Sequence, residues 1–128
     1  MESIMVAAPR QYDDEFRSRL KSLGTVQDAD EGGLALDDGT SRVYVTRNDF
    51  AQDELEPEEL ERLQSMIATP VFYAVDFSDI RLVRKVMEAI ADDPDLVVDN
   101  DHGVLMPGSE FVELLRRRPD WDWRSSAP

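Results

Sequence analysis

The stretch VFYAVDFSDIRLVRKVMEAI, residues 71–90, contains the pattern that decides the fold. Its first six residues, Val71–Asp76, form a nearly continuous apolar run, which predicts a buried central β-strand. The apolar residues that follow recur instead at spacings of three, four and three. This period predicts an amphipathic helix over residues 79–91, with Ser78 as its N-terminal cap.

The pattern on either side extends this strand and helix into a larger arrangement. Residues 4–45 run strand, helix, strand, glycine-containing turn and further strands, and residues 71–106 show a similar order. An Asp-Gly pair at 38–39 separates two runs of alternating hydrophobicity, which is typical of a hairpin. The two runs, 33–37 and 41–47, are therefore expected to pair as antiparallel strands.

These elements predict one α+β domain over residues 1–128, with residues 119–128 as a C-terminal tail. One further helix is expected to begin at Pro57. Another short helix, capped by Ser109, is expected just before the tail. We expect a mostly antiparallel sheet of short strands with the helices packed on one face. The similar order of elements indicates two βαββ-like halves, without a residue-level repeat.

The composition excludes several classes of protein. The chain has 28 acidic and 14 basic side chains, a net charge of −14, and 41% hydrophobic residues, which is too apolar for a disordered chain. It contains no cysteine, which excludes disulfides, thiolate zinc sites and cysteine nucleophiles. The negative charge disfavours bare nucleic acid and anionic membranes as partners and favours a basic protein.

The amino-terminal segment lacks the features of a targeting sequence. Its apolar run, Ile4–Ala8, is too short for a signal peptide, and no basic residue precedes it. No other run approaches the roughly 20 apolar residues that a membrane-spanning helix needs. A cytoplasmic protein is therefore expected, with no membrane among its partners.

Negative charge is concentrated between Asp28 and Glu61. These 34 residues contain 12 acidic and 2 basic side chains, a net charge of −10, whereas the other 94 residues carry −4. Two interpretations are open: a surface that attracts and binds a basic protein, or a solvated loop and helix start. On the first interpretation, the candidate partner-binding carboxylates here and in a second acidic cluster are Asp37, Asp38, Asp49, Asp53, Glu54, Glu56, Asp99 and Asp101.

The second acidic cluster, residues 92–101, raises the question of metal binding and catalysis. A loop from Asp99 to Glu110 has carboxylates at positions 1, 3 and 12 of a calcium-binding loop, but Val104 stands where the glycine of the sharp turn belongs. His102, the only histidine, could act as a general base beside the aspartates. A polar turn with a structural histidine is the alternative, because no catalytic or metal-binding motif surrounds it. We expect no catalytic residue, metal or cofactor.

Two tryptophans, Trp121 and Trp123, stand in the C-terminal tail. Residues two apart in an extended segment point to the same side. Packing back onto the domain is the favoured interpretation, since such large rings rarely stay exposed. The other is a pair of interface anchors, because tryptophan is enriched at binding hot spots. Both residues are therefore included among the candidate partner-binding residues.

Three short segments in the C-terminal part suggest a family: DNDHG at 99–103, PGSEF at 107–111 and WDWR at 121–124. Together with the surrounding sequence over 72–124, they resemble small acidic bacterial immunity proteins, which are encoded beside polymorphic toxins. The resemblance implies a non-catalytic inhibitor that binds a toxin domain in the cytosol of the producing cell.

The expected function is therefore that of an immunity-type protein, which neutralises a cognate toxin domain by occluding its active site with an acidic surface. A small ligand-binding or regulatory α+β module is the first alternative. An enzyme that uses His102 with neighbouring aspartates is the second.

Overall fold

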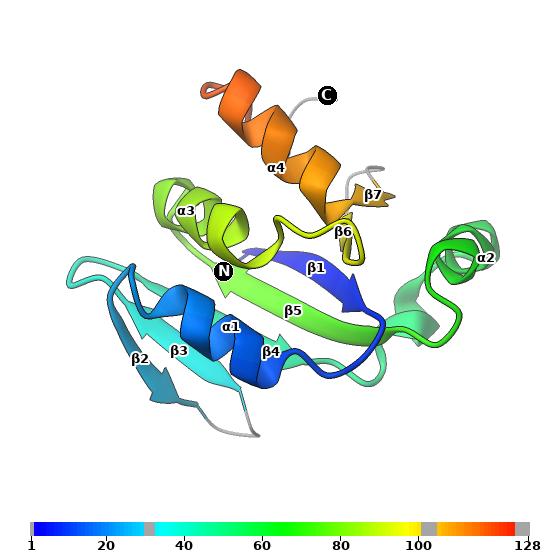
Figure 1. Cartoon of the computed structure of the whole chain (residues 1–128), viewed down its shortest axis with the longest axis horizontal. Helices are drawn as coiled ribbons and strands as arrows, with labels where there is room; N and C mark the ends of the chain where they lie inside the picture. Colours follow the sequence, from blue (N-terminus) through cyan, green and yellow to red (C-terminus); the bar gives the residue numbers. More distant parts are fainter. Residues whose placement is uncertain (1, 30–32, 101–104, 125–128) are drawn as a thin grey trace.

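The computed structural model describes residues 2–29, 33–100 and 105–124. In these segments seven strands form one antiparallel sheet in the order β2-β3-β4-β5-β1-β6-β7 (Figure 1). The strands are β1 (Glu2–Ala8), β2 (Thr25–Asp28), β3 (Leu34–Asp37), β4 (Arg42–Arg47), β5 (Val71–Phe77), β6 (Val97–Asp99) and β7 (Leu105–Pro107). The same segments contain the helices α1 (Asp13–Leu20), α2 (Pro57–Met66), α3 (Ile80–Ile90) and α4 (Gly108–Arg117) and the 3₁₀ helix η2 (Ala51–Glu54). The predicted α+β class and antiparallel sheet are confirmed.

The predicted central strand is also confirmed. β5 is the middle strand of the sheet and pairs along its full length with β1 and on its other side with β4. The helix α3 follows it, but its cap is Asp79 rather than Ser78, because the Asp79 carboxylate accepts the backbone N–H of Arg81 at 2.9 Å. Likewise, α4 begins at Gly108, before the predicted cap Ser109, and has no side-chain cap.

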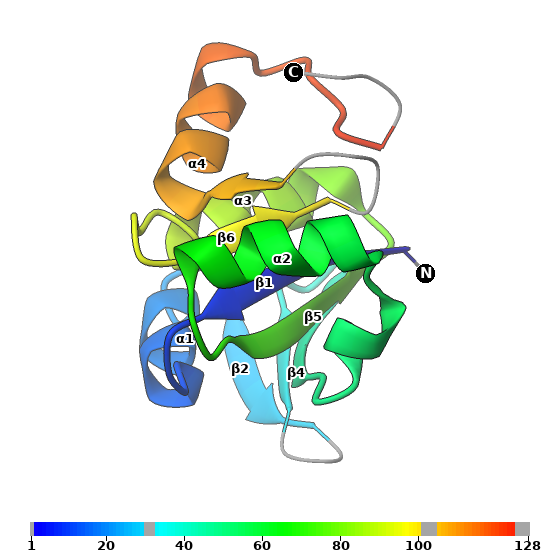
Figure 2. The same cartoon turned by 90° about the vertical axis from the view of Figure 1, so that its right-hand side faces the viewer.

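Two βαββ-like halves interlock in this sheet. The series β1–α1–β2–β3 and β5–α3–β6–β7 each contain a strand, a helix and an antiparallel strand pair. They interlock because β1 lies between β5 and β6, while β4, which continues the first half, pairs with β5 (Figures 1 and 2). The adjacent strands β4-β5-β1-β6 with α1 and α3 have the order of a ferredoxin-like βαββαβ unit. The strands β2, β3 and β7 and the helix α4 extend that unit.

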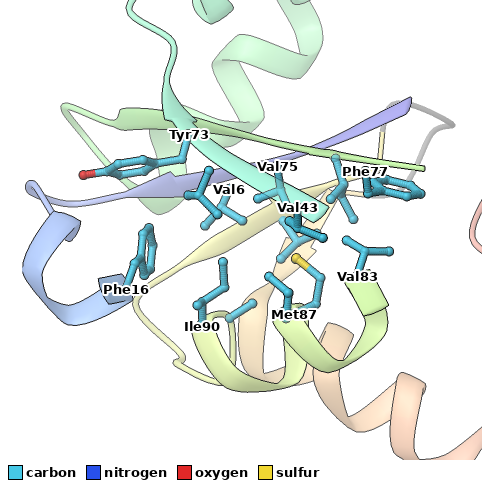
Figure 3. Close-up of a cluster of buried hydrophobic side chains, with 14 of the residues drawn as sticks. Val6, Phe16, Val43, Tyr73, Val75, Phe77, Val83, Met87 and Ile90 are labelled. Carbon is cyan, nitrogen blue, oxygen red and sulfur yellow. The ribbon is translucent and has the colours of Figure 1, made fainter. Parts of the chain in front are cut away.

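The main core lies between one face of the sheet and the helices α1, α3 and α4. Figure 3 shows Val6, Val75 and Phe77 of the sheet pointing toward Phe16 of α1 and Met87 of α3. Five of the eleven residues of α3 are buried, and three of them, Val83, Met87 and Ile90, belong to the predicted apolar spacing. Because full burial of one such side chain contributes about 1.5–3 kcal/mol, this layer holds most of the stabilising contacts.

The helix α2 departs from the expected arrangement with helices on one face. Strand alternation turns Ala7, Phe72 and Val97 to the second face of the sheet, where Leu63 and Ile67 of α2 complete a separate small core. Figure 1 accordingly shows α2 standing apart from α1 and α3. The physical reason is that the central strands carry apolar residues on both faces, so the second face also requires cover. α2 provides that cover for only part of it.

The C-terminal tail packs back onto the main core. Trp121 and Trp123 lie against Phe111 of α4, with ring centroids 5.7 and 5.5 Å apart. Arg84 of α3 donates to the backbone carbonyl of Trp121 at 2.5 Å, and the buried Asn100 donates to that of Trp123 at 3.0 Å. This geometry agrees with the packing interpretation of the tail.

Candidate partner-binding surface

Part of the second sheet face is covered by no helix in the part of the chain that the structure describes. We call this surface the open sheet face; its residues are Ser3, Tyr44, Thr46, Ala74 and Asp76, all partly or fully exposed. Asp76 of β5 lies between Ser3 of β1 and Tyr44 of β4 in the strand register. A solvent-open hollow of about 440 Å³ lies against the β4 and β5 residues of this face.

An acidic segment borders this face. We use this name for residues 49–61, DFAQDELEPEELE, which contain seven carboxylates and no basic side chain. The segment forms η2 and the first turns of α2, which begins with a capping box between Glu56 and Glu59. A second hollow, of about 90 Å³, is lined by Glu54 of this segment and by Ser3 of the sheet. The acidic segment and the open sheet face therefore form one continuous surface.

Phe50 is the most exposed large hydrophobic side chain of the described residues, at 73%. Its loop is fixed, because Asn48 donates its backbone N–H to the carbonyl of Phe72 at 2.9 Å and accepts the N–H of Phe50 at 3.2 Å. Aromatic residues are enriched at protein interfaces, which makes Phe50 a candidate contact residue. Sequence analysis missed Phe50, for which the signal was a lone aromatic residue between Asp49 and Asp53 in a polar loop.

The carboxylates of the acidic segment differ in what they already contact. Asp49 forms an ion pair with Arg47, with 2.9 Å between Oδ1 and Nε. Glu56 is engaged in the capping box of α2. Asp53 and Glu54 are exposed, and neither forms an ion pair with another described residue. These two are the predicted carboxylates best placed to contact a basic partner.

Asp76 is the acidic residue of the open sheet face. Burial raises the pKa of its carboxyl above the ordinary value, and the amino-terminal charge opposes this shift to a smaller extent. The two arginines of β4 are engaged by other groups: Arg42 by the Tyr44 hydroxyl and by Asp37 at 3.0 Å, and Arg47, which lines the same hollow, by Asp49. Within residues 2–29, 33–100 and 105–124, Asp76 thus has no ion-pair partner and lines the hollow.

Asp37 and Asp38 serve the turn between β3 and β4. Asp37 accepts the N–H of Gly39 at 2.7 Å, and Asp38 accepts those of Ser41 and Thr40 at 2.9 and 2.8 Å. These backbone hydrogen bonds lower the pKa of both carboxyls. Both residues line a separate depression beside β2, so the structure does not bring them into the candidate surface.

Burial corrects two other candidates, the tryptophans, and leaves a third, Asp99, with little exposed surface. Trp121, Trp123 and Asp99 are only 4%, 1% and 6% exposed. The tryptophans fill the main core beneath α4, so neither offers a surface contact to a partner. Asp99 lies at the end of β6 and, although mostly buried, lines the hollow of about 90 Å³ beside Glu54. Asp101 and His102 lie outside the described residues, and their assignments stay predictions.

The second acidic cluster is used within the fold. Asp92 pairs with Arg116 at 3.2 Å, and Asp93 accepts the backbone N–H of Asp95 at 2.9 Å. In the described segments, no group of three or more His, Cys, Asp or Glu side chains is placed to hold a metal ion. The same segments contain no helix of the length and hydrophobicity that crossing a membrane requires.

The fold and this surface define an acidic α+β domain in which an uncovered sheet face is bordered by carboxylates and an exposed aromatic ring. Comparisons with protein-family models, curated proteins and solved structures found no match to this chain. The chemistry of the surface is accordingly the guide to its partner.

Proposed function

We propose that this protein is an inhibitor of the immunity type, which binds a positively charged toxin domain and blocks its active site. The observation that carries the proposal is the acidic segment, with seven carboxylates and no basic side chain around the exposed ring of Phe50. The resemblance of the C-terminal part to immunity proteins supports the same class.

Mutual repulsion makes the acidic segment unfavourable for folding alone. Like charges within a Debye length, about 10 Å at 0.1 M salt, repel one another and destabilise a compact state. In the described part of the chain, only Asp49 of the seven acidic residues has an ion-pair partner. A basic protein would relieve this repulsion, so binding accounts for the charge better than solubility does.

The proposed mechanism has two stages. Long-range attraction first orients the basic surface of the toxin domain toward the acidic segment and raises the association rate. Phe50 then becomes buried at the interface, while Asp53 and Glu54 pair with lysine or arginine side chains around it. A basic cleft that normally holds an anionic substrate is blocked, because the carboxylates take the places of the substrate's negative charges.

A small-molecule site is less well supported. The hollow beside the acidic segment, about 90 Å³, is below the roughly 300–1,000 Å³ of typical ligand pockets. The larger hollow over the open sheet face is open to solvent rather than enclosed. Both features suit contact with a protein surface better than enclosure of a small molecule.

Co-expression tests the proposed function. The gene directly upstream is expected to encode a protein with a C-terminal toxin domain that arrests growth when it is expressed alone. This chain should restore growth and co-purify with that domain in equal amounts. A chain with Asp53→Lys and Glu54→Lys should fold but lose protection, whereas Asp14→Lys with Asp120→Lys should keep it. Absence of protection, or full protection by far less than one molecule of this chain per molecule of toxin domain, would overturn the proposal.

A further inference from the structure

We propose that the open sheet face receives an arginine side chain of the protein partner, whose guanidinium lies on the carboxylate of Asp76 and against the ring of Tyr44. The inference rests on the proposed function, because it names the contact by which a basic partner engages this surface.

The place of Asp76 in the fold suits a fixed anchor point. It lies on the middle strand of the sheet, and the backbone on both sides is held by pairing with β1 and β4. Its neighbours on the same face, Ser3 and Ala74, are small and leave the carboxylate accessible from the hollow of about 440 Å³. A binding group on a rigid strand is positioned more precisely than one on a loop.

Among the described residues, no arginine or lysine forms an ion pair with Asp76, although Arg47 lines the same hollow. Arg42 is held by the Tyr44 hydroxyl and by Asp37, and both contacts raise the pKa of its guanidinium. Arg47 is held by Asp49. The amino-terminal charge offsets only part of the cost of burying the Asp76 carboxylate, because the pKa of this carboxyl stays raised. An incoming cation on the exposed side would remove more of that cost.

Arginine fits this position better than lysine. Its planar guanidinium binds a carboxylate through two parallel hydrogen bonds, which a lysine ammonium cannot do. It is also more weakly hydrated and stacks on aromatic faces, and Tyr44 directly opposes Asp76 across the strand pair.

Backbone-amide NMR of the full chain tests this site with a defined probe, N-acetyl-arginine amide. Titration should produce saturable shifts at Tyr44, Thr46, Ala74 and Asp76. The citrulline analogue, which has nearly the same shape but no charge, should bind about tenfold more weakly or not at all. Equal shifts from the citrulline analogue, or arginine shifts confined to residues 49–61, would overturn the inference.

Matched variants separate this inference from the proposed function. Asp76→Asn should abolish the arginine shifts, whereas Asp14→Asn, the same chemical change on α1, should leave them intact. In the complex with the toxin domain, Asp76→Asn should weaken affinity about tenfold and Asp14→Asn should not change it. Full affinity of the Asp76→Asn chain would overturn the inference and leave the proposed function standing. A chain that binds the arginine amide but no toxin domain would overturn the proposed function and leave the arginine site standing.

Discussion

Phe50 and Asp76 occupy positions that folding alone disfavours. An exposed aromatic ring forgoes the gain of burial, and the partly buried carboxylate of Asp76 loses hydration that the amino-terminal charge offsets only in part. Phe50 belongs to the acidic segment, and Asp76 lies on the open sheet face that this segment borders. Side chains that reduce stability at one continuous surface are expected where binding, rather than folding, determines the residue.

Asp76→Asn is expected to raise stability at neutral pH. The pKa of Asp76 is raised in the folded state, so the folded chain binds this proton more tightly than the unfolded chain, where the carboxyl pKa is about 3.9. The contribution of Asp76 to the free energy of unfolding is therefore fully present below the unfolded pKa and is lost as pH rises through the folded pKa. The asparagine variant does not ionise and avoids this loss.

Thermal melts of the variant and the wild type between about pH 3 and 7 measure this effect. The melting temperature of Asp76→Asn should exceed that of the wild type by a margin that grows as the pH rises. Asp14→Asn, the same chemical change at an exposed residue on α1, serves as the matched control. A melting temperature of Asp76→Asn that falls below the wild type at neutral pH contradicts the account.

Phe50→Ala separates binding from stability. Because the ring is 73% exposed, its removal should change the free energy of unfolding by less than about 0.5 kcal/mol. Binding to the toxin domain should weaken by about 2 kcal/mol, as for a central interface anchor. Urea unfolding and calorimetric titration measure the two quantities. A variant that is destabilised but binds with full affinity rules out the anchor role.

At the scale of elements, α3 connects the main core to the C-terminal tail. One side of the helix is buried against the sheet, while Arg84 donates to the backbone carbonyls of Leu115 and Trp121 at 2.8 and 2.5 Å. Arg124 closes the tail onto the amino-terminal strand through an ion pair with Glu2 at 2.7 Å. The tail is therefore part of the folded domain as far as residue 124.

Trp123→Ala is expected to lower the free energy of unfolding by about 3–5 kcal/mol, because removing a large buried ring leaves a cavity. The ring is 1% exposed and contacts Phe77 and Phe111. Asp120→Ala, in the exposed part of the tail, should change stability by less than about 0.5 kcal/mol. Urea unfolding distinguishes the two variants. Unchanged stability of Trp123→Ala with lost affinity would restore the ring as a partner contact.

Elements with a strong hydrophobic period could be predicted from the sequence, and their relative placement could not. The apolar run of β5 and the spacing within α3 predicted both elements and the central position of β5. The choice of Asp79 over Ser78 as the cap depends on the residue at which the backbone becomes helical, since both types cap well. The apolar stripe of α2 could pack on either face of the sheet. The face that α2 covers depends on α1, α3 and α4, which are distant in sequence and cover the other face.

Of the candidate surface, only the concentration of negative charge could be predicted from the sequence. The acidic segment is visible in the sequence, whereas the burial of Asp99, Trp121 and Trp123 results from long-range packing that local pattern does not contain. Asp76 appeared only as the last residue of an apolar strand. Its exposure to the hollow depends on how far α2 extends over the sheet.

At the scale of the whole molecule, charge is distributed unevenly. The acidic segment carries seven negative charges and no positive charge, half of the net −14, within residues 49–61. On α4, by contrast, basic side chains pair with acidic ones, as Arg116 does with Asp92 at 3.2 Å and Arg117 with Glu113 at 3.7 Å. The molecule therefore presents its strongest attraction for cations on the side of the acidic segment.

The rate of association with the toxin domain tests this attraction directly. We compare the wild type with a variant in which Asp53, Glu54 and Glu58 are each changed to lysine. Glu56, also predicted to bind the partner, is left intact because it caps α2. The control makes the same change of charge at three exposed carboxylates on α1, α4 and the tail: Asp14, Glu110 and Asp120.

The account predicts that wild-type association slows by about tenfold or more as salt rises from 0.1 to 1 M and the Debye length falls from about 10 to about 3 Å. The acidic-segment variant should associate slowly at all salt concentrations, with a smaller change in its dissociation rate, while the control variant should retain both fast association and its salt dependence. Equal association rates for the two variants, or a wild-type rate independent of salt, would contradict the claim that the acidic segment attracts and binds a basic partner.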